Sequence, residues 1–204
     1  MLIQLKNKDG KVLFSYDIVG NNHRLTLGAA MKATVAFDFA DFSNWDLRYF
    51  DLAGHGFYKC NFSGAQLDCA LMYSASFIAC DFSGASLVGA SIDYARISAK
   101  CEFKGATIRN GAALNAGCSI IQLPTITPNG VCLVAYDTDK GILLDGGSIS
   151  QVPPDELEEL TMQLIGYTSA PPDQKLIEEQ AFLKIYRSAL DFIKVYFEVN
   201  RGQK

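Results

Sequence analysis

The sequence predicts a mainly β protein whose central part is a square coil of short extended segments. First, the phrase CNFSG at residues 60–64 returns as CDFSG at residues 80–84, twenty residues later. Second, a large apolar residue recurs at every fifth position from Phe37 to Ile97, and after a slip of one residue beyond Lys100 the pattern resumes at Phe103 and Ile108. Third, a mostly small residue, alanine or cysteine, stands two positions before most of these centres.

A period of five fits neither a helix nor a plain strand, because their side chains repeat every 3.6 and every 2 residues. Each five-residue unit therefore needs a bend, and four units close one square coil of twenty residues with one inward centre on each side. Coils joined by backbone hydrogen bonds stack about 4.8 Å apart, so like side chains lie above one another. The predicted core columns are Phe42, Phe62, Phe82, Phe103; Leu47, Leu67, Leu87, Ile108; Leu52, Met72, Ile92; and Phe37, Phe57, Phe77, Ile97.

The segment before the repeats, residues 1–34, predicts a cap, since an open coil end exposes unpaired backbone groups. The alternating stretch at its start reads as a hairpin with Asp9-Gly10 in the turn, and Leu25 to Thr34 reads as a short helix across the first coil. In the first coil Trp45, Phe50 and His55 occupy the small position. They would overfill an interior coil, so we expect them where the solenoid meets this cap.

The repeats decay after Ile108, so residues 35–118 are the predicted solenoid and residues 119–204 a separate C-terminal region. Residues 131–147 predict a hairpin that turns at 137–141, and Pro153-Pro154 opens a predicted helix over 155–167. A longer helix is expected from about Asp173 to Val199. One buried face is expected on this helix, made of Leu176, Ile177, Phe182, Leu183, Ile185, Tyr186, Leu190, Ile193 and Phe197.

The units at about residues 35–110 resemble the pentapeptide-repeat family, whose consensus is similar to A(D/N)LXX. The resemblance implies a right-handed quadrilateral β-helix, here of about four coils. A hairpin and a helix that run straight into the repeats, followed by a helical C-terminal tail, resemble members encoded by bacteriophages and prophages. That origin implies the cytoplasm of a bacterial host.

No catalytic, cofactor-binding or metal site is expected, and so no enzyme. The six cysteines contain no CxxC pair and only two histidines could assist them, which favours reduced thiols in a cytoplasm. A GxxxxGK phosphate loop is absent from the sequence. His55 reads as a packed residue, and the pairs Glu158-Glu159 and Glu178-Glu179 read as solvated helix surface.

The charge balance argues against direct binding to nucleic acid or to an anionic membrane, since the net charge is −4 and the pI is about 5.2. No run approaches eighteen apolar residues, so no membrane span is expected. Some family members imitate DNA, which would need on the order of ten negative charges over four coils. Residues 35–110 hold eight acidic and six basic residues, a weak match.

The outward positions carry the residues that we expect to contact a protein partner. They are Phe39, Tyr49, Tyr58, Tyr73 and Tyr94, with Ile78 and Val88. Alternatively, the hairpin and the helical tail fold back over them, or the C-terminal helix pairs with its copy in a homodimer. The sequence therefore predicts a non-enzymatic protein-binding or assembly module, a phage or prophage accessory protein. The alternative is a DNA-mimicking inhibitor of a type II topoisomerase, DNA gyrase.

Overall fold

The computed structural model describes residues 1–33, 36–92, 94–98, 100–108, 111–123, 133–146, 149–155, 158 and 172–201. The chain forms two compact units, Met1–Ser119 and Ile120–Lys204. The predicted helix over 155–167 lies mostly outside the described part of the chain. Within that part the chain is mostly sheet, with the helices α1 and α3.

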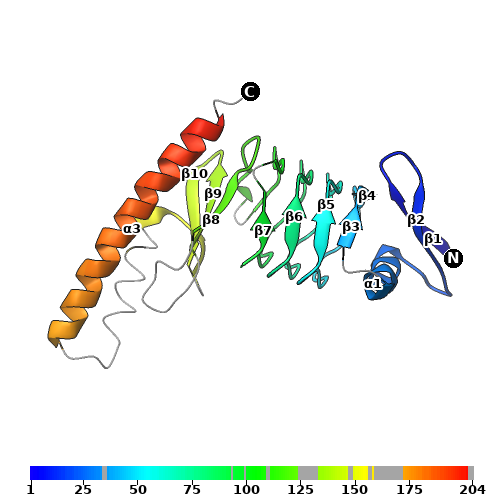
Figure 1. Cartoon of the computed structure of the whole chain (residues 1–204), viewed down its shortest axis with the longest axis horizontal. Coiled ribbons are helices and arrows are strands. Elements are labelled where there is room, and N and C mark those ends of the chain that lie inside the picture. The colour runs from blue at the N-terminus through cyan, green and yellow to red at the C-terminus, as the bar shows by residue number, and fades with distance from the viewer. Residues whose placement is uncertain are drawn as a thin grey trace. The chain divides into compact units, whose positions relative to one another are not determined.

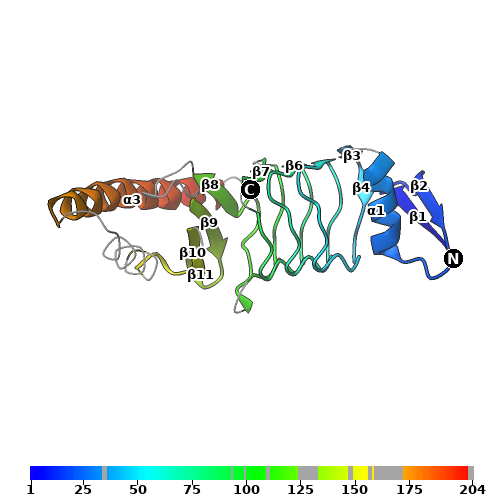
Figure 2. The same cartoon turned by 90° about the horizontal axis from the view of Figure 1, so that it is seen from below.

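Four short parallel strands form one side of the coils in the N-terminal unit. They are β3 (Ala36–Asp38), β5 (Gly56–Tyr58), β6 (Ser76–Ile78) and β7 (Arg96–Ile97), and they lie side by side in that order (Figure 1). Phe37 pairs with Phe57 and Phe57 with Phe77, so each step along the sheet is one turn of twenty residues. Figure 2 shows the successive turns of the chain between α1 and β7.

The other three sides stack through single parallel bridges. Asn61 pairs with Asp41 and Asp81, and the same offset of twenty joins Asp46 to Gln66 on the next side. After the slip at Lys100 the offset becomes 21, as in the bridge between Asp81 and Glu102. We name the four sides by their first centres: the Phe37, Phe42, Leu47 and Leu52 sides.

The centres of the units fill the interior as columns. The rings of Phe62 and Phe82 stack with centroids 4.9 Å apart, and those of Phe82 and Phe103 are 5.0 Å apart. Phe77 meets Phe82 edge to face at 5.3 Å, which joins two columns. All the predicted column residues except Ile97 are at most 5% exposed. Ile97 is half-buried because β7 is the edge strand of its sheet, so no further strand covers it.

Each corner among the described residues of the coils carries a residue in the left-handed backbone region, two positions after the centre. On the Phe42, Leu47 and Leu52 sides the next amide donates to the carbonyl of the centre, for example Ala65 to Phe62 and Ala85 to Phe82, both at 3.0 Å. Positive φ at the third residue of a turn closed in this way is the geometry of a type II turn. The corner residues include Gly64 and Gly84, but also the non-glycine residues Phe39, Asn44, Tyr49, Lys59, Cys69, Ser74, Ala79 and Tyr94.

The Asp or Asn before many centres has a structural role in the turn. The Oδ1 atoms of Asp41, Asn61 and Asp81 each accept a hydrogen bond from the backbone amide two residues on, at 2.8–3.0 Å. Asp51 does the same on the Leu52 side. A short carboxylate or amide can mimic a backbone turn in this way. This requirement accounts for many of the solenoid's acids.

The hairpin of β1 (Leu2–Asn7) and β2 (Val12–Asp17) closes the first coil. Strand β1 pairs antiparallel with β4 (Ala40–Asp41), which covers the open backbone edge of the Phe42 side. Helix α1 (His23–Ala33) begins two residues before the predicted start because the side chain of Asn22 caps the amide of Leu25 at 2.9 Å. The predicted end at Thr34 lies outside the described residues.

Two of the three large residues at small positions, Trp45 and Phe50, meet this cap, and no contact of His55 with it is seen. Trp45 is buried, and its ring stacks on the His23 imidazole at 4.3 Å. The guanidinium of Arg24 lies 5.4 Å from the ring centre of Phe50. Helix α1 therefore covers the bulky corner of the first coil, which explains why alanine is not needed there.

The last coil is closed by its own chain. Gly105 donates to the carbonyl of Leu114 at 2.9 Å, and Leu114 donates back to Ala106 at 2.7 Å. The amide of Gly117 donates to the carboxylate of Glu102 at 2.7 Å. These bonds satisfy backbone groups of the Phe42 side that would otherwise face an absent next coil.

The C-terminal unit is an antiparallel sheet with one long helix packed on it. The sheet order is β11 (Ile149–Val152), β10 (Gly141–Gly146), β9 (Leu133–Thr138) and β8 (Ile120–Leu123), so it exceeds the predicted hairpin by two strands. Helix α3 (Pro172–Arg201) packs Tyr186, Ile193 and Phe197 against Ala135 and Leu144. The two extra strands are four residues each, too short for a periodic pattern to reveal them.

The expectation of a single apolar face on α3 is wrong. Leu176, Ile177 and Ile185 are exposed, while Tyr186, Ile193 and Phe197 are buried. The helix carries two apolar faces, and the sequence pattern merged them into one.

The inward columns can be tested by a pair of neighbouring substitutions. We expect Phe82→Ala to lower the free energy of unfolding by about 3–5 kcal/mol, because it removes a ring from the middle of a stacked column. Ser83→Ala should change it by less than about 0.5 kcal/mol. Urea unfolding of both variants checks this, and equal shifts would contradict the burial of Phe82.

The left-handed corners can be tested by exchanging serine and glycine between two of them. Ser74 (φ 55°) and Gly84 (φ 68°) occupy equivalent corners, and a Cβ at Gly84 would meet no atom within 4 Å. Ser74→Gly should stabilise the fold by about 0.5–1 kcal/mol, and Gly84→Ser should destabilise it by about 1–2 kcal/mol. Thermal unfolding of both variants measures this; shifts of the same sign would contradict the assigned corners.

Candidate functional site

The four outer sides of the solenoid differ in chemistry. The Phe42 side is polar, with Asp41, Asn61, Asp81 and Glu102 stacked along it. On the Leu47 side a bidentate ion pair joins Arg48 to Asp46 at 2.7 and 2.9 Å. The hydrogen bond from Arg48 lowers the pKa of Asp46 to about 2.

The five predicted contact residues are spread over three sides. Tyr49 projects from the Leu47 side and is 72% exposed; Tyr73 and Tyr94, at 51% and 63%, belong to the Leu52 side. Tyr58, at 37%, and the half-buried Phe39 share the Phe37 side. The structure therefore does not join all five into one surface.

The Phe37 side is where predicted residues touch one another. The rings of Phe39 and Tyr58 meet edge to face with centroids 5.6 Å apart. The Lys59 ammonium lies 5.5 Å from the ring centre of Phe39 and 5.2 Å from that of Tyr58, and the Lys8 ammonium lies 5.9 Å from Phe39. We call Lys8, Phe39, Tyr58 and Lys59 the cation–aromatic cluster. Such contacts hold the ammonium groups over the rings, so the cluster offers positive charge beside apolar surface.

The cluster extends along the flat strand surface. Ile78 is the register neighbour of Tyr58 on β6 and is also exposed. Asp38, which precedes Tyr58 in the same column, is exposed too. This surface therefore carries aromatic, aliphatic and cationic side chains with one acidic side chain, that of Asp38, beside them.

Two members of the cluster occupy strained corners. Phe39 has φ 58° and Lys59 has φ 52°, and these positions stack one above the other. A left-handed conformation costs a non-glycine residue about 1–2 kcal/mol, which glycine at other corners avoids. The same cost applies at the other corners without glycine, such as those of Tyr49 and Tyr94.

Sequence reasoning missed the two lysines of the cluster. Lys59 lies twenty residues after Phe39, so aligning the columns places it directly over that ring. Lys8 reaches Phe39 only because β1 pairs antiparallel with β4. No pattern in the sequence reveals that pairing.

The cysteine column is built for packing. The thiols of Cys60, Cys80 and Cys101 are buried, and each donates to a carbonyl of the Phe37 side at 3.3–3.4 Å. The hydrogen bond with Cys101 lowers the pKa of Cys80, but the bond with Cys60 and burial outweigh it and raise that pKa to about 12. The hydrogen bond with Cys80 and burial also raise the pKa of Cys101, so the thiols of Cys80 and Cys101 are protonated at neutral pH and unreactive. Cys69 is the exposed thiol of the solenoid.

His55 and the acidic residues were the other candidates for a catalytic or metal site. His55 is half-buried, and its Nδ1 lies 2.9 Å from the carbonyl oxygen of Ala53, a local turn contact. Among the described residues no group of three or more His, Cys, Asp or Glu side chains could hold a metal ion.

A cavity of about 300 Å³ lies between the hairpin, α1 and β3, and Asp38 is the sole polar residue in its lining. Within the described ranges no helix has the length and apolar character to cross a membrane.

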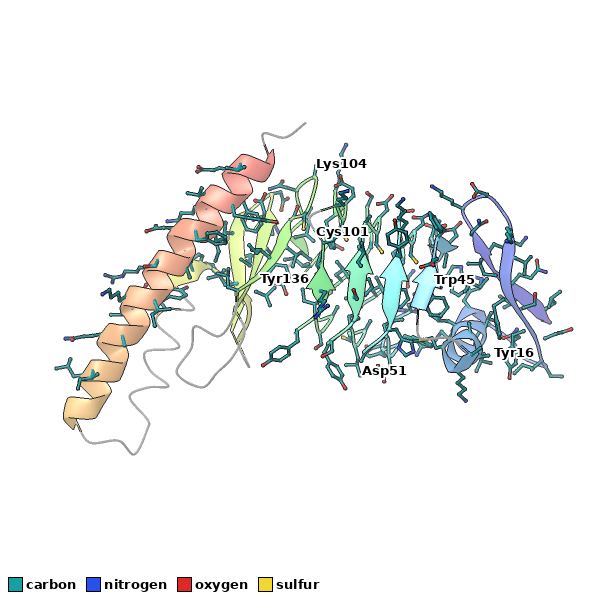
Figure 3. All side chains as sticks on the ribbon, viewed as in Figure 1. Tyr16, Trp45, Asp51, Cys101, Lys104 and Tyr136 are labelled. Carbon is teal, nitrogen blue, oxygen red and sulfur yellow. The ribbon has the colours of Figure 1, made fainter. Side chains whose placement is uncertain are left out.

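Trp45 marks the cap end of the solenoid in Figure 3, where the solenoid meets α1. The same view places Lys104 and Asp51 at opposite edges of the coils.

Comparison with known families gives a match to part of the chain. The model of pentapeptide repeats, in eight copies, matches residues 57–93. That segment is the middle of the solenoid, and the match supports the resemblance drawn from the column pattern. It implies a right-handed β-helix for these repeats. No curated protein matches the chain.

Several solved structures are similar to part of this chain. A pentapeptide repeat protein from the Arabidopsis thaliana thylakoid lumen is 23% identical over 34% of this chain and 66% of that one, with a TM-score of 0.23. QnrB1, a plasmid-mediated fluoroquinolone resistance protein, is 29% identical over 37% of this chain and 39% of its own, with a TM-score of 0.19. A third structure is HetL, a pentapeptide repeat protein involved in heterocyst differentiation regulation from the cyanobacterium Nostoc sp. strain PCC 7120. It is 23% identical over 38% of this chain and 42% of its own, with a TM-score of 0.17. The chain thus spans less than two thirds of the first two.

The contact of His23 with the first coil makes the cap sensitive to pH. Burial lowers the pKa of His23 below its ordinary 6.5, so the folded protein binds this proton less tightly than the unfolded chain does. The stability is therefore fully present above about pH 6.5 and falls as the pH drops through the unfolded value toward the folded one.

We expect the wild-type protein to lose thermal stability between about pH 7 and about pH 5, and His23→Gln to lose less over this range. Calorimetry of both proteins measures the slopes. Identical slopes would mean that the imidazole does not contribute.

Proposed function

We propose that this protein is a non-enzymatic binding module that docks a protein partner on the Phe37 side of its solenoid. The observation that carries the proposal is the cation–aromatic cluster. Its two rings and two ammonium groups come from the hairpin and from two successive coils. Tyr58 stands on β5, Phe39 and Lys59 on the corners that follow β3 and β5, and Lys8 in the turn of the hairpin.

The chemistry of the cluster defines the partner. Aromatic residues provide much of the binding energy in protein interfaces, and exposed rings on a rigid support lose little entropy on binding. Lys8 and Lys59 add positive charge at the same place. A partner segment with a carboxylate next to an apolar side chain fits both features.

The setting of this function follows from the sequence resemblance. Hairpin, helix and repeats in this order resemble phage and prophage proteins, so we place the module among the accessory proteins of a phage or prophage. Its partner would then be a host or viral protein in the bacterial cytoplasm.

DNA mimicry, the alternative, gains no specific support from the geometry. The carboxylates of Asp41, Asp51 and Asp81 hold turns, and Asp46 is paired with Arg48. These carboxylates keep their charge, but imitation of duplex DNA needs a large net negative charge along the axis, and residues 35–110 hold eight acidic against six basic residues.

Comparative capture from bacterial lysate tests the proposal. We expect Tyr58→Ser/Lys59→Ser to retain about a tenth or less of the protein that the wild type captures, because it removes half of the cluster. The matched control Tyr73→Ser/Tyr94→Ser removes two more exposed rings from the Leu52 side and should capture the wild-type amount. Quantitative mass spectrometry gives the ratios.

Equal capture by both variants, or loss only in the control, would overturn the assignment to the Phe37 side. A supercoiling assay with DNA gyrase tests the alternative function, DNA mimicry. We expect no inhibition at about 10 μM protein, and inhibition would favour a DNA mimic.

A further inference from the structure

The cap holds a cavity of about 300 Å³ that lies apart from the cation–aromatic cluster. We call it the cap cavity. It lies beside β3, which Figure 1 places at the α1 end of its sheet. Leu5 in its lining is fully buried, whereas Leu13 and Asp38 are exposed, so the cavity opens to solvent on one side. Its apolar walls come from the hairpin, α1 and β3: Leu5, Leu13, Phe14, Ala30, Ala33 and Phe37.

The volume of the cap cavity sets the size of its ligand. Ligand sites in proteins begin at about 300 Å³, and a dry cavity of about 150 Å³ is enough to bind benzene. Twice that volume accommodates a body of about ten non-hydrogen atoms, such as a phenyl ring with a short chain. The apolar walls favour a hydrocarbon body, because apolar surface that leaves water on binding contributes favourable free energy.

Two alanines of α1 leave this space. Ala30 and Ala33 are three residues apart, so they lie on the same face of the helix, and both line the cavity. A larger side chain at either position would fill part of the cavity and add apolar contacts to the cap. The cap therefore gives up packing here, which is typical of a place that receives a ligand.

Asp38 supplies the charge in the lining. Its carboxylate is exposed, and within the described part of the chain it makes no ion pair. The ammonium groups of Lys8 and Lys59 lie over the rings of the cation–aromatic cluster instead. The carboxylate of Asp38 is therefore available to a ligand, and its charge selects a cationic group.

The main chain of Asp38 adds a second acceptor. The carbonyl of Tyr58 accepts a hydrogen bond from Phe39 of the coil before it, at 2.8 Å. One coil on, Ile78 accepts from Lys59 in the same way, so the carbonyl at this position points toward the preceding coil. Asp38 holds this position in the first coil, where the cap takes the place of a preceding coil. Because β3 is the outer strand of its sheet, no described strand covers that carbonyl.

We propose that the cap cavity binds a small amphiphilic amine, with an aromatic or aliphatic body of about ten non-hydrogen atoms and an ammonium group that meets Asp38. An ammonium group has three donors, which suits a carboxylate and a carbonyl side by side. A lysine side chain of a partner protein brings the same charge, but its thin four-carbon stem fills less of this volume. The proposal concerns the cap and stands whether or not the Phe37 side binds a partner.

Isothermal titration calorimetry of the full chain at neutral pH, with three probes of similar size, tests the site. Phenylpropylamine should bind with a dissociation constant on the order of 0.1 mM, an ordinary affinity for ten non-hydrogen atoms. The neutral phenylpropanol should bind about threefold to tenfold more weakly. The anionic phenylpropanoate should bind at least about 30-fold more weakly, because its charge repels the carboxylate of Asp38.

Two substitutions separate the charge from the cavity. Asp38→Asn should lower the affinity for phenylpropylamine to that of the neutral probe. Asp51→Asn is the matched control and should bind as the wild type does, because Asp51 is an exposed acid outside the cavity whose turn an amide oxygen can also hold. Ala33→Leu should weaken the amine and the neutral probe alike, by at least about tenfold, because it fills the cavity. Circular dichroism checks that the variants are folded.

The same titrations name the results that contradict the proposal. A wild type that binds no phenylpropylamine at about 5 mM would overturn it. Equal affinity for the amine and the anion, or an Asp38→Asn variant that binds the amine as tightly as the wild type, would overturn the class of ligand. Binding that a folded Ala33→Leu variant retains in full would place the amine outside the cap cavity and overturn the site.

Discussion

The hydrogen bonds between successive coils fix the spacing of everything else in the N-terminal unit. Asn61 donates to Ala40 below it and Phe62 donates to Asp81 above, so neighbouring coils are held in register. At that spacing each inward position must stack on its own kind, and Phe62 and Phe82 come within 4.9 Å of each other. The interior therefore allows one large side chain on each side of each coil, and the variation between coils is left to the outer surface.

This constraint explains what the sequence could predict. The Phe62 and Phe82 column follows from a period of five and a return of twenty, because both are local properties of the chain. The bulky Trp45 could be assigned to the cap because it would not fit an interior coil. The exposed state of Tyr49 and Tyr94 follows from the same register.

Contacts that depend on docking could not be predicted. The place of Lys8 over Phe39 requires the antiparallel pairing of β1 with β4, which joins residues more than thirty apart without any repeat. On α3, Ile185 and Tyr186 are adjacent in sequence but lie about 100° apart around the helix, so one is exposed and the other buried. The apolar residues of α3 belong to both faces, so their spacing in the sequence does not show which face the sheet covers.

The two closures of the solenoid also limit how copies of it can assemble. At the first coil an antiparallel strand occupies the edge, and at the last coil the segment around Leu114 folds back over it. A parallel coil from another molecule finds no free backbone edge on the Phe42 side at either end. On that side the two closures prevent a second solenoid from adding its coils end to end, which is how the stacked parallel strands of amyloid grow.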